Sequence, residues 1–200
     1  NPKTLIVRYP ESTCTFPPRS NILSNQNTQK LYSVTGDFFL YANKDNQRFL
    51  LDNKRNNIEK DKILICGFPR YEKWWVKKFI GKKQSKTSSF RILVALRHPN
   101  NHNFQISSYK YIVNSILKTA EQIKNCKVVF KLHPHNADYK LLKDTLSTFN
   151  NKIWSIKKEH LMVLAHNSDL CITIMTSGCF DCLAVNKPTI EFFRLKYELD

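Results

Sequence analysis

The stretch V-V-F-K-L-H-P-H, residues 128–135, decides the fold class, because a short apolar run stops there at a proline between two histidines. Proline has no N–H to donate to a sheet, so the strand must end near Leu132. A short apolar run of this kind is typical of a strand buried on both faces, as in a parallel sheet. His133 and His135 would then lie beyond the carboxyl end of that strand.

Strands and helices alternate on both sides of this stretch, from Phe90 to the end of the chain. Apolar runs predict strands at 90–97, 128–132, 152–156, 170–174 and 189–193. Helical spacing and caps predict helices at about 108–125, 138–149, 159–166 and 179–185. We expect Ser107 to cap the first of these helices, which has a stripe at Tyr111, Ile112, Ser115, Ile116, Thr119 and Ile123. The predicted class is α/β, a Rossmann-like parallel sheet with right-handed crossovers.

The first 85 residues are less regular and predict a partial α/β region. Short runs predict strands at 4–9 and 62–66 and a helix at 48–52. The segment K-K-Q-S-K-T-S-S, residues 82–89, has the composition of a linker. We therefore predict two domains, 1–85 and 86–200. Because the chain starts N-P-K-T-L-I-V-R, without an initiator Met, we expect it to be part of a longer protein.

The charge indicates an anionic partner, since 32 Lys and Arg face 16 Asp and Glu, a formal net charge of +16. A bias toward lysine beside asparagine in an AT-rich genome is an alternative explanation. The charge is spread along the chain without an RNP motif, zinc finger or basic zipper, so we expect no nucleic-acid partner. No apolar run approaches the roughly 18–20 residues of a membrane span. We expect a cytoplasmic protein, with an anionic membrane surface as a further partner.

Six cysteines stand at 14, 66, 126, 171, 179 and 182. Cys179 and Cys182 form a lone C-x-x-C, which without a second pair is a weak metal or redox signal. We therefore expect reduced thiols and no metal site.

Polar residues follow two of the predicted strands, and carboxyl ends of parallel strands form the ligand-binding edge of such sheets. His133 and Pro134 end one strand, while Thr176, Ser177 and Gly178 open the helix after another. A helix start offers N–H groups to a phosphate, hydroxyls add donors, and glycine allows close approach. Alternatively, Ser177 only caps its own helix. Because both groups lie on one edge, a phosphate site is the preferred interpretation.

Two charged residues extend this edge. Arg97 ends the first strand and could bind a phosphate with two hydrogen bonds, or it is an ordinary surface arginine. Glu191 lies near the end of the last strand and could bind ribose hydroxyls or pair with a lysine.

With these motifs in order, the chain resembles the C-terminal half of GT-B glycosyltransferases. K-L-H-P-H, followed some 40 residues later by T-S-G-C-F-D-C-L-A-V-N-K-P-T-I-E-F-F, resembles capsule and lipopolysaccharide transferases that use CMP-activated Kdo or sialic acid. It also resembles CDP-glycerol glycerophosphotransferases, as do Gly67-Phe68-Pro69-Arg70 and Leu96-Arg97. The resemblance covers about residues 60–193. Asp181 only roughly matches the family's acidic helix residue, and we expect only the tail of an N-terminal acceptor domain to fit before residue 80.

The resemblance implies transfer of a sugar or glycerol phosphate from a CMP- or CDP-linked donor to a surface glycan or lipid-linked acceptor, without a metal or other cofactor. His133-Pro134 and Thr176-Ser177-Gly178 would bind the donor phosphate, and residues 1–85 would belong to the acceptor side. The catalytic residues stay unassigned, because nothing places Glu11, Asp37 or Asp181 beside an acceptor. A UDP-sugar 2-epimerase and a non-catalytic polyanion-binding module remain alternatives.

Overall fold

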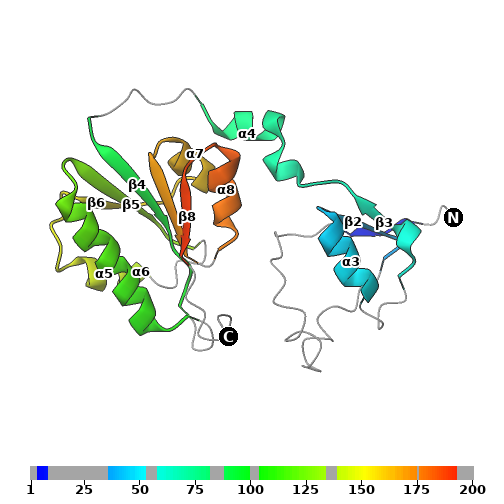
Figure 1. Cartoon of the computed structure of the whole chain (residues 1–200), viewed down its shortest axis with the longest axis horizontal. Helices are drawn as coiled ribbons and strands as arrows, with labels where there is room; N and C mark the ends of the chain where they lie inside the picture. Colours follow the sequence, from blue (N-terminus) through cyan, green and yellow to red (C-terminus); the bar gives the residue numbers. More distant parts are fainter. Residues whose placement is uncertain are drawn as a thin grey trace. The chain divides into compact units, whose positions relative to one another are not determined.

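The computed structural model of the chain describes residues 4–8, 36–52, 58–81, 88–99, 104–133, 139–174 and 176–192. These residues belong to two compact units, 1–72 and 73–200 (Figure 1). Each unit contains a parallel sheet and at least one helix, which confirms the predicted α/β class. The assignment of residues 1–85 and 86–200 to two functional domains stays a prediction.

The N-terminal unit is a small three-stranded parallel sheet with one helix. Its strands lie in the order β1 (Val7–Arg8), β2 (Phe38–Tyr41) and β3 (Ile63–Ile65), and α3 (Lys44–Asp52) connects β2 to β3. Single turns of 3₁₀ helix occupy Lys60–Lys62 and Pro69–Tyr71. Phe39 and Ile63 form the buried centre. Strand β2 was not predicted, because its four residues lie within a polar, asparagine-rich region of the sequence.

The C-terminal unit begins with α4 (Lys73–Phe79), which was also not predicted. Its strands are β4 (Phe90–Ala95), β5 (Cys126–Lys131), β6 (Trp154–Lys157), β7 (Leu170–Ile174) and β8 (Thr189–Phe192). The helices that connect them are α5 (Ile106–Gln122), α6 (Tyr139–Leu146), α7 (Leu161–His166) and α8 (Gly178–Ala184). Each strand and helix predicted beyond Phe90 is present, with ends that differ by a few residues.

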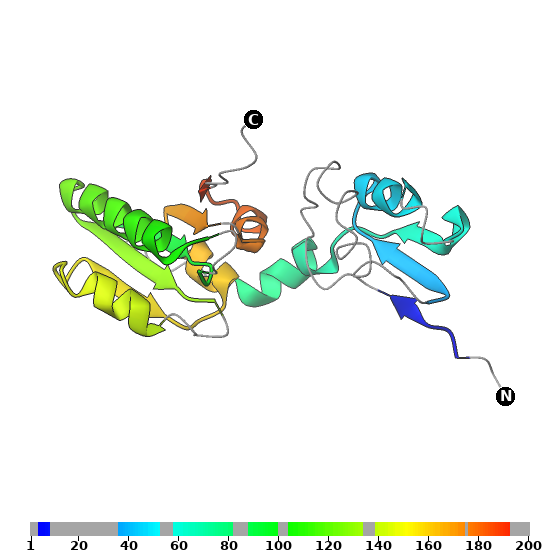
Figure 2. The same ribbon diagram turned by 90° about the horizontal axis from the view of Figure 1, so that it is seen from below.

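The five strands of this unit are all parallel and lie in the order β6-β5-β4-β7-β8. Helices α5 and α6 cover one face of the sheet, and α7 and α8 lie on the other (Figures 1 and 2). The main core lies under α5 and α6, where Ile92, Val94, Val128 and Phe130 of the strands meet Leu117 and other helix residues. This order places β4 at the centre of the sheet.

The predicted apolar stripe of α5 was wrong in part. The buried side chains are Tyr109, Ile112, Val113, Leu117 and Ala120, whereas Tyr111 and Ile123 are exposed. Ser115 and Thr119 lie on the exposed side, where their hydroxyls donate to carbonyls one turn earlier. The helix also begins at Ile106 with Gln105 as N-cap, so Ser107 lies within the helix and does not cap it.

Within the part of the chain that the structure describes, no helix is both long and apolar enough to cross a bilayer.

Candidate functional site

The C-terminal sheet has a topological switch point between β4 and β7. From β4 the chain builds outward through β5 and β6 on one side, and then crosses to β7 and β8 on the other. The helices change faces at the same place. In open parallel sheets of this kind, ligands bind beyond the carboxyl ends of the strands that flank the switch point. The residues just after β4 and β7 therefore have the placement of a ligand site.

Three predicted site residues follow the strands around this point. Arg97 comes two residues after β4, His133 two residues after β5, and Thr176 two residues after β7. All three are partly buried. Because neighbouring strands are about 5 Å apart, β5 and β7 lie about 10 Å apart with β4 between them. The predicted common edge is thus present, and we call Arg97, His133 and Thr176–Gly178 the carboxyl rim. Pro134 and His135 lie outside the described residues.

The turn from β7 into α8 satisfies much of its own hydrogen bonding. Thr176 Oγ1 accepts from the N–H of Gly178 at 3.3 Å. The N–H groups of Cys179 and Phe180 donate to the carbonyls of Thr176 and Ser177. Ser177 is exposed and its side chain makes no cap to the helix, so the structure does not show the capping that the sequence left open. Since α8 has seven residues, the helix start by itself makes a weak phosphate site.

Gly178 lies at a close contact between α7 and α8. It is buried, and a Cβ added to it would lie 2.6 Å from Cδ2 of Leu161, the first residue of α7. Such a distance is far below van der Waals contact, so a larger residue here would force the end of the Leu161 side chain to shift. The close contact between the helices is one explanation for a glycine at this position. The predicted approach of a ligand to its backbone is another.

Glu191 of β8 holds the same turn from the neighbouring strand. One carboxylate oxygen accepts the N–H of Thr176 at 3.2 Å, and the other accepts the hydroxyl of Thr173. Thr173 and Glu191 are direct partners in the ladder between β7 and β8. In the structure, the Glu191 carboxylate therefore binds two threonines of the chain, whereas the sequence suggested contacts with ribose or with a lysine. Thr173 was not singled out from the sequence, although a polar residue in the apolar run L-C-I-T-I was a signal.

Cys171 of β7 and Cys179 and Cys182 of α8 are free thiols, and Cys179 lies at the turn itself. Burial and, next, the charge of Glu191 raise the pKa of Cys179 to about 11. Cys171 and Cys182 share a hydrogen bond, and this bond together with burial raises the pKa of the Cys182 thiol. Among the residues that the structure describes, no group of three or more His, Cys, Asp or Glu side chains could hold a metal ion.

The comparisons with known proteins concern the fold. The sequence matches no protein-family model and no curated protein. Among solved structures, UDP-GlcNAc 2-epimerase from Neisseria meningitidis, bound to UDP-GlcNAc, is similar over 86% of this chain and 48% of its own, with 18% identity and a TM-score of 0.58. A structure of MnaA from S. aureus with UDP is similar over 86% and 45%, with 13% identity and a TM-score of 0.60. The GtfA/B complex is similar over 81% and 31%, with 12% identity and a TM-score of 0.50.

The chain has a GT-B-like fold. It spans about half the length of the N. meningitidis and S. aureus structures. The fold expected from the resemblance is therefore confirmed, whereas the CMP- or CDP-dependent branch of that family stays a prediction.

Proposed function

We propose that this chain forms the nucleotide-binding half of an enzyme that acts on a nucleotide-activated sugar. The observation that carries the proposal is the carboxyl rim: Arg97, His133 and Thr176 follow adjacent strands around the switch point of a GT-B-like sheet. The N. meningitidis protein with this fold was solved with UDP-GlcNAc. Because one fold serves many reactions, the proposal depends on the residues of the rim rather than on the fold alone.

In this proposal the rim binds the phosphates of the nucleotide. The guanidinium of Arg97 provides a planar pair of donors that suits a phosphate. His133 adds a ring N–H, and the exposed hydroxyl of Ser177 adds a third donor. Donors arranged in advance around a leaving phosphate stabilise the charge that develops as its bond to the sugar breaks. These groups would do so without a metal ion or other cofactor.

Our first candidate reaction is transfer of a sugar, or of glycerol phosphate, from a CMP- or CDP-linked donor to a glycan or lipid-linked acceptor. The base that activates the acceptor stays unassigned. Asp37 is an unsuitable candidate, because its carboxylate accepts the N–H of Ile6 at 2.8 Å and so stabilises the N-terminal sheet. Asp181 is buried in α8, 6% exposed, where an acceptor hydroxyl would not reach it. Glu11 lies outside the described residues.

The second candidate is a UDP-sugar 2-epimerase. The specific observation in its favour is that one structure with this fold is a UDP-GlcNAc 2-epimerase bound to UDP-GlcNAc, and that a second, MnaA, contains UDP. Incubation of the full-length protein with UDP-GlcNAc and no acceptor separates the two reactions. An epimer supports this candidate, whereas product formed only when an acceptor is added supports the transferase.

A thermal-shift screen with CMP, CDP, UMP, UDP and GDP tests nucleotide binding itself, since a ligand of the folded state raises the melting temperature. We expect a cytidine nucleotide to give the largest shift. His133→Ala and Ser177→Ala should each weaken its binding severalfold, whereas Ser107→Ala, an exposed serine of α5, should leave it unchanged. Equal binding by all three variants would contradict the phosphate assignment. Weak, strongly salt-dependent binding without nucleotide preference would instead support the polyanion-binding module.

A further inference from the structure

The carboxyl rim accounts for little of the chain's positive charge, and a second group of cations lies on the opposite part of the same sheet. A groove of ≈500 Å³ runs between α7 and the strands β5 and β6. Its lining contains four basic residues, Arg91, Lys127, Lys152 and Lys157, and one acid, Glu159. We call this hollow the basic groove.

Strand register brings two of these cations together. Arg91 of β4 and Lys127 of β5 are direct partners in the parallel ladder, so their Cα atoms are about 5 Å apart. Both belong to the set of alternate residues that faces away from the α5–α6 core, since Ile92 and Val128 face that core. Like charges directly opposite each other destabilise a sheet. An anion bound between the two side chains would offset this repulsion.

The groove is open because α7 is short. This crossover helix has six residues, about 9 Å of helix, and packs over β4. It leaves the neighbouring face of β5 and β6 uncovered, with Val129 and Ser155 between the strands' basic residues. Val163 and Leu164 of α7 form the opposite wall. The hollow is thus basic at its floor and apolar along one side, as ligand sites for small molecules commonly are.

The acids near the groove do not balance its cations. Glu159 forms an ion pair with Lys157 at 3.7 Å, and both side chains are about half exposed. Asp169 lies beside Arg91 and accepts its backbone N–H at 2.8 Å. The Lys127 ammonium donates to the backbone carbonyl of Lys152. Among the residues that the structure describes, the four cations and these two acids leave an excess of positive charge at the groove.

We propose that the basic groove binds a small molecule carrying a phosphate monoester, with the phosphate between Arg91 and Lys127. A phosphate monoester has a charge of about −1.5 to −2 at pH 7, which matches two cations, whereas a carboxylate would match one. The volume lies within the range of small-molecule sites. Nucleic acid fits less well, because Trp154 is the one aromatic residue of the groove's lining and is partly buried against the α5–α6 core.

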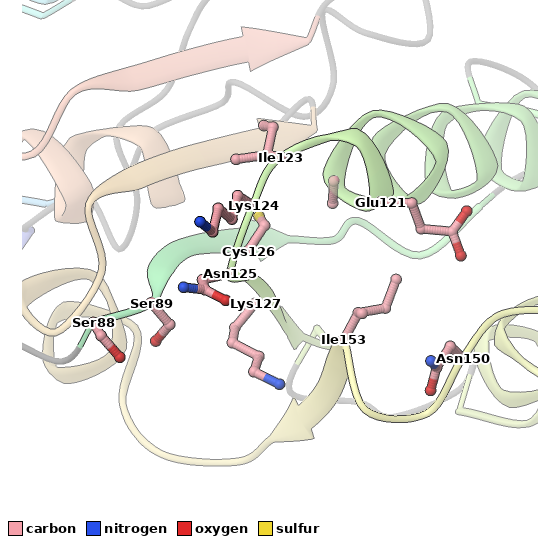
Figure 3. Close-up of a pocket in the computed structure, with 11 residues that line it drawn as sticks. Ser88, Ser89, Glu121, Ile123, Lys124, Asn125, Cys126, Lys127, Asn150 and Ile153 are labelled. Atoms are coloured by element: carbon pink, nitrogen blue, oxygen red, sulfur yellow. The ribbon is translucent and has the colours of Figure 1, made fainter.

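This site is distinct from the carboxyl rim. Arg91 and Arg97 are six residues apart along β4 and its extension, a separation of about 20 Å. The groove instead adjoins a second hollow, of ≈640 Å³, at the amino ends of β4 and β5. Figure 3 shows this hollow with Lys127, Asn125 and Ser89 on its walls, and Lys127 lines both. The hydroxyl and amide groups of the second hollow would suit the uncharged part of the ligand.

The test is a titration of the isotope-labelled protein with inorganic pyrophosphate at 0.15 M salt, followed through backbone amide NMR signals. We expect the largest shifts at Arg91, Lys127 and Ser155, in addition to any at the rim. The double variant R91Q/K127M should weaken this response at least tenfold. The control K110M/K118M loses the same charge from exposed positions of α5 and should change it less than twofold.

Signals that shift only at Arg97, His133 and Thr176, or no shifts at all, would overturn the proposal of a phosphate site in the basic groove. Neither result would decide the proposed function, which the nucleotide screen tests separately. An equal loss in K110M/K118M, or binding seen only with long polyphosphate or RNA, would overturn it as well, because it would show attraction to net charge alone. If R91Q/K127M fails to fold, the shifts in the unsubstituted protein and the single variant K152M decide the matter.

Discussion

Replacement of Glu191 by alanine should destabilise the C-terminal unit and release the turn that carries Thr176. The Glu191 carboxylate accepts two hydrogen bonds, from the Thr173 hydroxyl and from the Thr176 N–H. Thr173 is fully buried, so the substitution leaves its hydroxyl in the interior without this acceptor, whereas Thr176 is only partly buried and its N–H can turn to water.

The magnitude follows from these two environments. A hydrogen bond to a charged acceptor contributes about 1.5–3 kcal/mol, and a buried donor left without a partner costs about 1–3 kcal/mol. We therefore expect Glu191→Ala to lower the free energy of unfolding by about 2–3 kcal/mol. Glu191→Gln keeps one acceptor oxygen and should cost about half as much. Thr173→Val removes the other partner of the buried bond and keeps the side-chain shape.

The assay is urea unfolding followed by tryptophan fluorescence, which reports on the C-terminal unit because Trp74, Trp75 and Trp154 all lie within residues 73–200. In a double-mutant cycle, Glu191→Ala and Thr173→Val together should cost about 1–2 kcal/mol less than the sum of the single changes. Additive effects, within about 0.3–0.5 kcal/mol, would refute a direct bond between these side chains.

Two further predictions concern the same helix. The pKa of Cys179 is raised to about 11, so the unfolded chain loses this thiol proton before the folded chain does as the pH rises. The free energy of unfolding should therefore fall from about pH 9 to about pH 11, and the fall should be smaller in Cys179→Ser. An identical pH curve for the two proteins would argue against the raised pKa. Gly178→Val should lower the free energy of unfolding by about 1–3 kcal/mol through overpacking, since a Cβ at this position would lie 2.6 Å from Leu161. Adding Leu161→Ala should recover part of this loss. An unchanged midpoint of urea unfolding in Gly178→Val would contradict the close packing.

The sheet of the C-terminal unit could be predicted from sequence because its signals are local. Apolar runs bounded by breakers mark β5 and β7, and β7 has the predicted ends, 170–174. The proline after His133 marks the end of its strand, and the regular alternation with helices marks the parallel connection. These local features are sufficient to place His133 and Thr176 on one edge of the sheet.

The errors arise where two local patterns compete. In α5, two stripes of apolar residues have helical spacing, and only the packing against β4 and β5 selects the one that contains Tyr109 and Val113. Strand β2 was missed because four residues in a polar region carry little periodicity. Helix α4 was missed because its lysines and tryptophans do not form one apolar face, and Val76 is its one buried residue among the seven.

Contacts between strands could not be predicted from the sequence. The bonds from Thr173 and Thr176 to Glu191 depend on the register of β7 and β8. The pairing of Arg91 with Lys127 likewise depends on the register of β4 and β5, 36 positions apart in sequence. Residue order gave no indication of either, so the internal support of the rim and the basic groove emerged only from the fold.

The most direct test of the central claim is an amide NMR titration of the protein with CDP, with UDP in parallel. The account predicts saturable shifts at Arg97, His133 and Thr176–Gly178, which weaken in Arg97→Gln, since Arg97 follows the central strand and so lies between the ends of β5 and β7. Shifts that are absent from these residues, or that are unaffected by Arg97→Gln, would contradict the claim that the carboxyl rim binds a nucleotide.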